Sequence, residues 1–319
     1  MHTYLDFERP IAELEGKVEE LRQLAAQDAA MQIDDEVARL QARAQALLAD
    51  TYVKLTPWQK ALVARHPARP HFSDYAASLF EDFTLLAGDR LYAEDPAVIS
   101  GIGRFAGRAV AIVGQEKGND TKSRVARNFG MARPEGYRKA QRLFALAERF
   151  GLPVISFADT PGAYPGIGAE ERGQAEAIAR TTEACLALGI PFVTMVIGEG
   201  MSGGALGIAV ANRVFMLEHA IYAVISPEGC ASILWRSADK AQEAAAAMRI
   251  TALDLLDLKV IDGIVREPVG GAHRDPAQTI AAVGETIARA LAEFEGQSPE
   301  QIRRQRRDKY LAIGRSLGG

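Results

Sequence analysis

The first fifty residues carry apolar side chains at alternating spacings of three and four, with Glu, Gln, Lys and Arg between them. The two apolar runs are Ile11, Leu14, Val18, Leu21 and Ala25, then Ile33, Val37, Leu40, Ala44 and Leu47. This heptad-like spacing predicts two helices that fold into an antiparallel hairpin with its turn near residues 28–34. An ordinary amphipathic helix on its own domain is the alternative. A helix pair this short is marginal alone, so we expect it to pack on a partner chain or on the main domain.

From residue 99 onward, short apolar runs alternate with stretches of helical periodicity. The predicted strands are 107–114, 153–157, 191–197, 214–217 and 222–225, and the predicted helices are 135–150 and 173–188. Repeated strand–helix units at this spacing predict an α/β protein with a mostly parallel sheet and right-handed crossovers.

Three further segments complete the predicted organisation. Residues 56–71 are rich in Pro, His and Arg and predict a connector with a short helix at most. Residues 75–83 are apolar and aromatic at helical spacing, which favours packing, and residues 295–307 are polar and basic, which predicts a surface helix. We therefore expect a helical extension and connector over 1–90, an α/β domain over 91–295 and a helical tail over 296–319.

Composition narrows the class of protein. The 319 residues are 48% hydrophobic and carry a net charge of −4, which fits a globular protein and disfavours a surface that binds nucleic acid throughout. No apolar run approaches the ~20 residues that span a bilayer, and no secretory signal precedes the first helix. The only cysteines, Cys185 and Cys230, are far apart and have no nearby histidine. The sequence thus predicts a cytoplasmic protein without a zinc site or a disulfide framework.

The segment from Glu199 to Ile208, EGMSGGALGI, follows an apolar strand and leads into a run of small residues. Gly203 and Gly204 then lie at a strand-to-helix turn, where missing Cβ atoms let a ligand approach the backbone. Free N–H groups at a helix N-terminus can hold an oxygen on which negative charge develops. A glycine turn that serves only close packing is the alternative, and the segment alone does not decide between them.

Two other loops also follow predicted strands and are expected at the same edge of the sheet. Residues 159–173 hold two prolines and three glycines within eight residues, which makes a stiff loop rather than a simple crossover. Its carboxylates, Asp159, Glu170 and Glu171, are candidates for acid–base work, although a helix-capping role is favoured. In residues 226–232, Cys230 has no histidine to activate it and is interpreted as a buried small residue.

The histidines argue against a side-chain nucleophile. None of the five, His2, His66, His71, His219 and His273, falls in the three loops. The sequence therefore does not support a Ser-His-Asp triad or a Cys-His dyad. Backbone N–H groups are the candidates for stabilising a negative charge in these loops. Upstream lies a basic stretch that can receive phosphates or form a solvated helix face. Its members are Lys117, Lys122, Arg124, Arg127, Arg133, Arg138 and Lys139.

Five runs of sequence resemble one known family along nearly the whole chain. They are QEKGNDTKSRVARNFGMARPEGYRKAQRL, DTPGAYPGIGAEERGQ, GEGMSGGALGI, ISPEGCASILWRSADKA and the late EPVGGAHRDP. Together they resemble the alpha-subunit family of bacterial acetyl-CoA carboxylase carboxyltransferases. One local departure is Met201, where the family pattern leads us to expect a glycine.

The resemblance implies a crotonase-like spiral of ββα units with an N-terminal helical hairpin extension. It further implies transfer of a carboxyl group from carboxybiotin, carried on a partner protein, to acetyl-CoA, which gives malonyl-CoA for fatty acid biosynthesis. The expected partners are a zinc-ribbon beta subunit in an α2β2 heterotetramer, the biotin carboxyl carrier protein and biotin carboxylase, so that no metal is bound by this chain. In this mechanism two backbone oxyanion holes replace a side-chain base.

The resemblance also suggests roles for individual residues. Gly204 and Ala205, with Gly203 adjoining, are expected to hold the biotin oxygen through their N–H groups. Gly162 and Ala163 would shape the biotin pocket, and Arg172 would meet the transferred carboxylate through its forked guanidinium. Lys122, Arg124 and Arg127 are the candidates for the CoA phosphates. A crotonase-type hydratase or decarboxylase that works alone, and a scaffold subunit, are the alternative functions.

Overall fold

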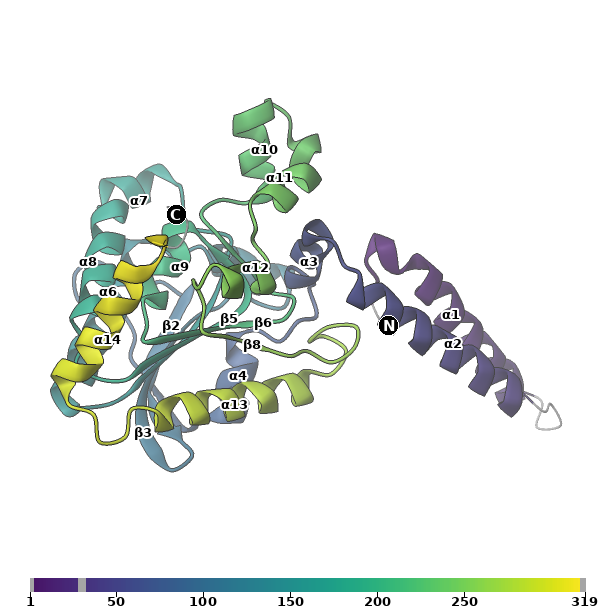
Figure 1. The fold of residues 1–319 in the computed structure, drawn as a ribbon, viewed down its shortest axis with the longest axis horizontal. Coiled ribbons are helices and arrows are strands. Elements are labelled where there is room, and N and C mark those ends of the chain that lie inside the picture. The colour runs from purple at the N-terminus through teal and green to yellow at the C-terminus, as the bar shows by residue number, and fades with distance from the viewer. Residues whose placement is uncertain (1–2, 28–32, 316–319) are drawn as a thin grey trace.

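One eight-stranded sheet forms the centre of the protein, as the computed structural model shows for the described residues, 3–27 and 33–315 (Figure 1). The strands are β1 Glu81–Leu85, β2 Val98–Phe105, β3 Arg108–Gln115, β4 Val154–Thr160, β5 Phe192–Met201, β6 Arg213–Leu217, β7 Ile221–Ala223 and β8 Gly263–Val265. Their order is β1-β2-β3-β4-β5-β6-β8, and β7 pairs with the far end of β5. β1, β2 and β3 pair antiparallel, and all pairs from β3 onward are parallel, which confirms the predicted mostly parallel sheet.

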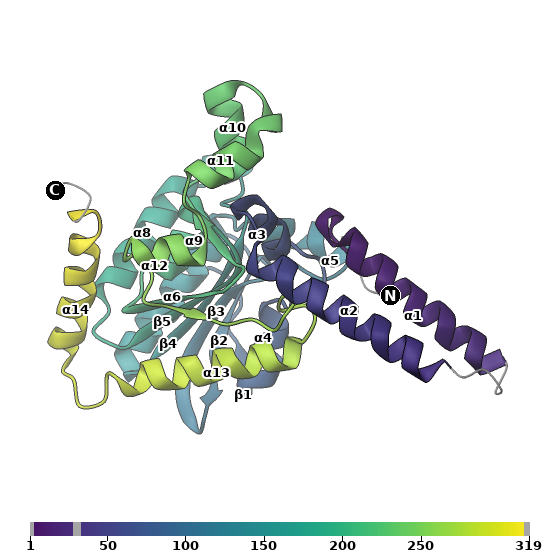
Figure 2. The ribbon, with the colours of Figure 1, turned by 45° about the vertical axis from the view of Figure 1, so that its right-hand side comes forward.

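Helices cover both faces of this sheet (Figures 1 and 2). One face carries α6 Pro134–Phe150, α8 Gln174–Ala187 and α9 Ser202–Ala209, with α14 Pro299–Ala312 packed on α8. The other face carries α4 Phe72–Leu79 and α13 Pro276–Ala292. The shorter helices are α3 Pro57–Ala64, α5 Thr121–Ala126, α7 Ile167–Glu171, α10 Pro227–Trp235, α11 Ala241–Ala247 and α12 Ala252–Asp257. Because both faces are covered, the central strands must be apolar on both sides.

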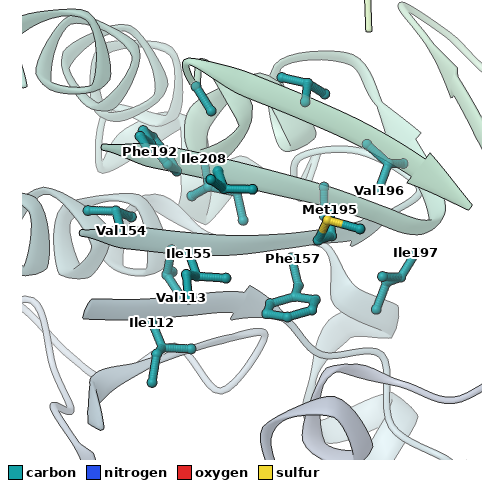
Figure 3. Packing of buried hydrophobic residues seen from close by; sticks show 14 of the residues in the cluster. Ile112, Val113, Val154, Ile155, Phe157, Phe192, Met195, Val196, Ile197 and Ile208 are labelled. Atoms are coloured by element: carbon teal, nitrogen blue, oxygen red, sulfur yellow. The ribbon is translucent and has the colours of Figure 1, made fainter. Parts of the chain in front are cut away.

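The core lies around β4 and β5, every residue of which is buried. Figure 3 shows Ile155, Phe157, Phe192 and Met195 packed between neighbouring strands and the helices that cover them. These continuous apolar runs explain why the sequence predicted both strands correctly.

Besides the end of β4, which lies at Thr160 rather than at the predicted residue 157, two predicted boundaries were wrong. The strand predicted over 191–197 continues to Met201, because β7 pairs with β5 from Glu199 to Met201. The segment 75–83 is helical only up to Leu79, and Glu81–Leu85 forms an edge strand on β2 instead. In both places a strand from elsewhere in the chain overrides the local pattern.

The N-terminal hairpin forms as predicted, with α1 Arg9–Gln27 lying against α2 Asp34–Val53. It projects from one side of the body, as Figures 1 and 2 show. Most of the predicted turn, residues 28–32, lies outside the described residues. At its base, Tyr52 donates a hydrogen bond of 3.0 Å to buried Glu8, and Arg274 of the main body forms a 2.8 Å ion pair with Glu15. The hairpin thus rests on the main body, which is one of the two expected packing arrangements.

The C-terminal helix α14 buries more of its polar side chains than the predicted surface helix would. Arg306 on this helix is fully buried and donates hydrogen bonds to backbone carbonyls that include those of Cys185 and Ile190, each at 2.9 Å. A basic pattern in the sequence cannot reveal that one of its arginines satisfies carbonyls at the end of another helix.

Candidate active site at the carboxyl ends of the central strands

The glycine turn lies where β5 ends and α9 begins. Met201 is the last residue of β5, and Ser202, the first residue of α9, adopts the left-handed region with φ of +56°. No side chain caps this helix N-terminus. In such a helix the N–H groups of the first turn have no carbonyl partner within the helix. Ala205 is the fourth helical residue, so its N–H is the first with a helical carbonyl acceptor, that of Met201. Gly203 and Gly204 therefore offer the freer donors.

Gly204 also brings two of the predicted loops together. A Cβ atom on Gly204 would lie 2.5 Å from the carbonyl carbon of Gly162 and 2.8 Å from the nitrogen of Ala163. Only glycine fits at such a distance from another backbone segment. On Gly203 a Cβ would meet the side chain of Ile178 at 3.3 Å, which is a milder contact. The structure thus places Gly203, Gly204, Gly162 and Ala163 in one site.

The loop that carries Gly162 is fixed by hydrogen bonds at both ends. Thr160 donates from its hydroxyl to the Gly162 carbonyl at 2.7 Å and accepts from the Gly162 N–H at 3.1 Å. Gln174 on α8 donates 2.9 Å hydrogen bonds to the carbonyls of Tyr164 and Ala132. The stiffness predicted from the prolines and glycines is thus reinforced by side chains at the two ends of the loop, Thr160 and Gln174.

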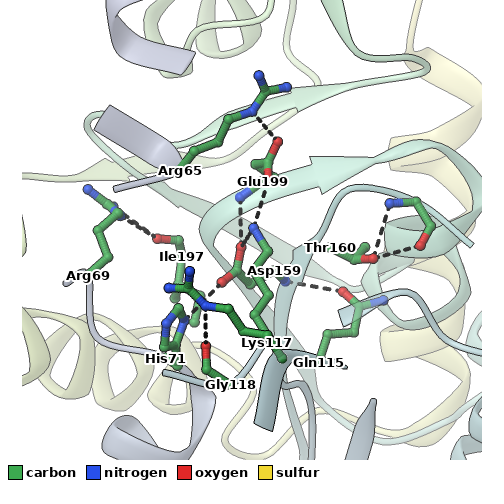
Figure 4. Close-up of polar contacts among 12 residues, drawn as sticks. Arg65, Arg69, His71, Gln115, Lys117, Gly118, Asp159, Thr160, Ile197 and Glu199 are labelled. Carbon is green, nitrogen blue, oxygen red and sulfur yellow. Dashed lines mark hydrogen bonds and ion pairs between the residues drawn. The ribbon is translucent and has the colours of Figure 1, made fainter. Parts of the chain in front are cut away.

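A buried ion network lies behind these two loops (Figure 4). The ammonium group of Lys117 lies 2.7 Å from Asp159 Oδ1 at the end of β4 and 2.7 Å from Glu199 Oε2 near the end of β5. Asp159 Oδ1 also accepts the Glu199 N–H at 3.0 Å, and His71 Nδ1 lies 3.6 Å from Asp159 Oδ2. The network therefore connects the two central strands at the edge that holds the glycine turn.

Arg65 extends this network toward the protruding α10–α11 lobe. Its Nε donates to Glu199 Oε1 at 2.6 Å, and its Nη1 donates to Glu228 on α10 at 2.5 Å. A cavity of about 160 Å³ opens beside the network and is also lined by Pro161, Arg124 and Phe129. The candidate site is thus backed by charges that come from five separate segments of the chain.

These carboxylates remain ionised. Burial alone would raise the pKa of Asp159, but Lys117 and His71 together hold it well below its usual range. The pKa of Glu199 is likewise lowered, since Lys117 and Arg65 outweigh the effect of burial. The helix-capping role favoured for Asp159 is therefore wrong, because its side chain is buried among ion pairs. Glu170 does lie in the first turn of α7.

Arg172 lies near the loop but is already paired. Its Nε and Nη2 approach the two carboxylate oxygens of Glu135 at 2.6 and 3.2 Å, and its guanidinium lies 4.6 Å from the centre of the Tyr92 ring. The Glu135 hydrogen bond raises the pKa of Arg172. A carboxylate that met Arg172 would therefore share the guanidinium with Glu135.

The basic stretch does not act as one surface. Arg124 lines the small cavity beside the ion network, and Arg127 lines a separate, mostly apolar cavity of about 460 Å³ between α4 and β2. Lys122 is exposed on α5. Lys117 and Lys139 are buried in ion pairs with Asp159 and Glu94 respectively, so neither the phosphate role nor the solvated-face alternative applies to them.

The third predicted loop begins α10 as expected, with the Ser226 hydroxyl accepting the Gly229 N–H at 3.1 Å. Cys230 is only half-buried, so its interpretation as a buried residue was wrong. The lobe around it exposes large apolar side chains, notably Val224 at 78% and Ile233 at 71%. A projecting lobe lacks enough neighbours to cover every apolar position, which the local sequence cannot reveal.

Sequence reasoning missed Gln115 and the pairing of Lys117 with Asp159 and Glu199. A signal was present, since each of these polar residues lies at or just beyond the carboxyl end of an apolar strand. Ligand sites of open α/β sheets form at that edge. Within the described ranges, no group of three or more His, Cys, Asp or Glu side chains is arranged to hold a metal ion. No helix in the same ranges has the length and apolar character needed to cross a bilayer.

A sequence model of the acetyl co-enzyme A carboxylase carboxyltransferase-like family matches residues 4–314. The chain is 64% identical over 317 residues to the acetyl-coenzyme A carboxylase carboxyl transferase subunit alpha of Xanthobacter autotrophicus, covering 99% of this chain and 100% of the relative. It is 65% identical to the protein of the same name from Methylobacterium nodulans, with the same coverage.

Solved structures support the fold. Transcarboxylase 12S aligns with a TM-score of 0.58 at 20% identity over 71% of this chain and 42% of its own. The beta subunit of Pseudomonas aeruginosa geranyl-CoA carboxylase aligns with a TM-score of 0.55 at 18% identity, over 76% of this chain and 46% of its own. A Pseudomonas malonate decarboxylase hetero-tetramer has a chain with a TM-score of 0.55 at 18% identity, over 66% of this chain and 84% of its own. The chain spans less than half of each of the first two, and the predicted crotonase-like α/β class is confirmed.

Proposed function

The chain belongs to the acetyl co-enzyme A carboxylase carboxyltransferase-like family, and from that membership we propose that it is the alpha subunit that transfers a carboxyl group from carboxybiotin to acetyl-CoA. The product would be malonyl-CoA, the starting unit of fatty acid biosynthesis. A cytoplasmic location is part of this proposal.

The observation that carries the proposal is the contact between Gly204 and the backbone of Gly162 and Ala163. It joins an uncapped helix N-terminus to a stiff loop at the carboxyl ends of β4 and β5. The two carboxylates at the strand ends beside this contact, Asp159 and Glu199, are held in ion pairs with Lys117. Backbone N–H donors therefore remain as the reactive feature of the site.

Biotin supplies a transferable carboxyl group and a ureido oxygen that becomes negative as that group leaves. In the proposed role, the N–H groups of Gly203 and Gly204 stabilise this charge, aided by the positive end of α9. Ala205 supports the turn from inside the helix. Gly162 and Ala163 form the opposite wall, where the absence of bulky side chains leaves room for the ring. Arg172 lies farther along the loop and is held by Glu135; it would orient the transferred carboxylate through the part of the guanidinium that Glu135 does not occupy.

The proposed partners complete the site from its open side. Val224 and Ile233 are highly exposed, and Ser202 at the start of α9 is exposed as well. Large uncovered apolar side chains beside a reactive turn favour a protein interface. We therefore propose the zinc-ribbon beta subunit as the chain that covers it, in an α2β2 assembly that receives the biotin carboxyl carrier protein after biotin carboxylase has acted. This assignment keeps metal binding on the beta subunit.

Lys122, Arg124 and Arg127 remain our candidates for the CoA phosphates. Lys122 is exposed, Arg127 is half-buried and donates to the Pro96 carbonyl at 2.8 Å, and Arg124 lines the cavity that also holds Pro161. Charge reversal at Arg124 and Arg127 should raise the KM for the CoA substrate and weaken its dependence on salt. An unchanged KM would return these residues to a purely structural role.

Reconstitution tests the function. Carboxylation of free biotin by malonyl-CoA, the reverse reaction, should appear only when the chain is combined with the beta subunit. Activity of the chain alone would favour an independent hydratase-type or decarboxylase-type enzyme, and an inactive complex would favour a scaffold. Gly204→Val should abolish turnover while the complex still assembles, because the added Cβ would collide with Gly162 and Ala163. Near-normal turnover in that variant would remove the oxyanion role.

A further inference from the structure

We propose that Gln115 is a positioning residue for the oxyanion turn, holding the Gly204–Ala205 peptide unit from behind and so fixing where the first turn of α9 places its N–H donors. This inference rests on the proposed carboxyl-transfer function. Gln115 is the last residue of β3 and is 1% exposed. It is part of neither the glycine turn nor the Pro/Gly loop, yet it contacts Asp159 at the end of β4, as Figure 4 shows, and Gly204 in α9.

Both ends of the Gln115 amide are in use. Its Nε2 donates a 2.6 Å hydrogen bond to the carbonyl oxygen of Gly204, and its Oε1 accepts the N–H of Asp159 at 3.1 Å. These two contacts fix the amide orientation, because a flipped amide would place two donors or two acceptors against each other. Gln115 thus links the end of β4 to the first turn of α9.

The turn needs such a restraint. Gly203 and Gly204 have no Cβ atoms to restrict their backbone torsions, and Ser202 before them adopts a left-handed conformation. α9 is only eight residues long and has no side-chain cap. Packing against Gly162 limits how close Gly204 can move but does not set the rotation of its peptide units. A hydrogen bond to the Gly204 carbonyl does fix the plane of the Gly204–Ala205 peptide unit, since each peptide unit is planar, and so anchors the Gly204 Cα atom to which its own N–H group is joined.

The ion network fixes Gln115 in turn. Asp159, whose N–H it accepts, is held by Lys117 through its carboxylate at 2.7 Å. The side-chain amide of Gln115 therefore links the buried ion network to the glycine turn. Gln115 contacts no reacting atom in this arrangement. It acts only on the position and direction of the backbone N–H donors in the glycine turn.

The test uses the reconstituted complex with the beta subunit, malonyl-CoA and free biotin. Gln115→Met keeps the side-chain length and removes both hydrogen bonds. We expect kcat to fall by about 10- to 100-fold, as small displacements of reacting groups do. The KM for malonyl-CoA should stay unchanged, and hydrogen exchange at the backbone amides of residues 202–205 should speed up.

Gln141→Met is the matched control. Gln141 on α6 donates to the carbonyl of Ala177 at 3.1 Å and to the Thr181 hydroxyl at 2.9 Å, away from the turn. This variant also loses two hydrogen bonds of a side-chain amide, from a half-buried position, and should keep wild-type kcat. Gln115→Glu, which keeps the size and the acceptor for Asp159 N–H, serves if the Met variant does not assemble.

A Gln115 variant with wild-type kcat, or with no more loss than Gln141→Met, would overturn the inference. Unchanged amide exchange at residues 202–205 would also overturn it. If the wild-type complex transfers no carboxyl group, the proposed function fails, and the exchange measurement still decides whether Gln115 orders the turn.

Discussion

The two ends of β5 hold buried cations in opposite ways. At its carboxyl end, Lys117 is paired with two ionised carboxylates, Asp159 and Glu199. At its amino end, Arg306 has neutral partners, among them the carbonyl oxygen of Ile190 at 2.9 Å and the side chain of Asn212. Burial lowers the pKa of Arg306 to about 10, whereas the pKa of Lys117 is raised by its carboxylates against the effect of burial.

The difference shows what each end is built to do. Carbonyl oxygens at the amino end are acceptors that the fold leaves behind when helix α8 stops, and one arginine satisfies them. The carboxyl end instead brings together Asp159 and Glu199, on adjacent strands, and Lys117, from the segment that follows β3, beside a reactive turn. Mutually paired buried charges contribute little net stability but restrict the geometry around them. We infer that the carboxyl end is organised for positioning and the amino end for stability.

Removing the lysine should have the largest effect. Lys117→Met leaves two buried carboxylates facing each other, so we expect a loss of about 3–5 kcal/mol in the free energy of unfolding. Turnover in the complex should fall as well, since the loops lose their shared anchor. Urea unfolding and the reverse carboxylation assay measure the two effects. Lys240→Met, which breaks only an exposed pair with Glu243, is the control and should change neither. Full activity in Lys117→Met would contradict the positioning role of this end.

Removing the arginine should affect stability alone. Arg306→Met leaves several carbonyl groups without donors, and we expect a loss of about 2–4 kcal/mol. The kcat of the folded complex should remain at the wild-type value, in contrast to Lys117→Met. Arg303→Ala lies one turn earlier on α14, where the side chain is half-exposed, and should cost less than about 1 kcal/mol. A lowered kcat in Arg306→Met would erase the distinction between the two ends.

Mild acid should lower the stability of the protein by a smaller amount, through histidines outside both ends of β5. Burial lowers the pKa of His219 to about 4 and that of His273 to about 3. Below pH 6.5 the unfolded chain binds a proton at each of these histidines and the folded chain does not. The free energy of unfolding therefore decreases as the pH is lowered. Between pH 7 and pH 6 the two histidines should together remove about 1 kcal/mol. Urea midpoints at the two pH values measure this loss, and His273→Gln should reduce it. An equal pH dependence in that variant would exclude His273 as a contributor.

The sequence predicted the elements whose character is local. The apolar runs of β4 and β5, the heptad-like spacing of the hairpin and the glycine-rich turn are all visible along the chain, because each depends on residues a few positions apart. The five resembling runs also identified the family and pointed to Gly204 before any geometry was available.

Tertiary structure decided which of those residues meet. That Gly204 touches Gly162, that Lys117 is a buried partner of Asp159 rather than a phosphate ligand, and that β5 continues to Met201 all depend on pairing between distant strands. The same holds for Arg306, which reads as one of several basic residues in a polar helix and is fully buried. A charge pattern along a chain records which groups are present, but their desolvation and their partners exist only after the strands have been placed side by side.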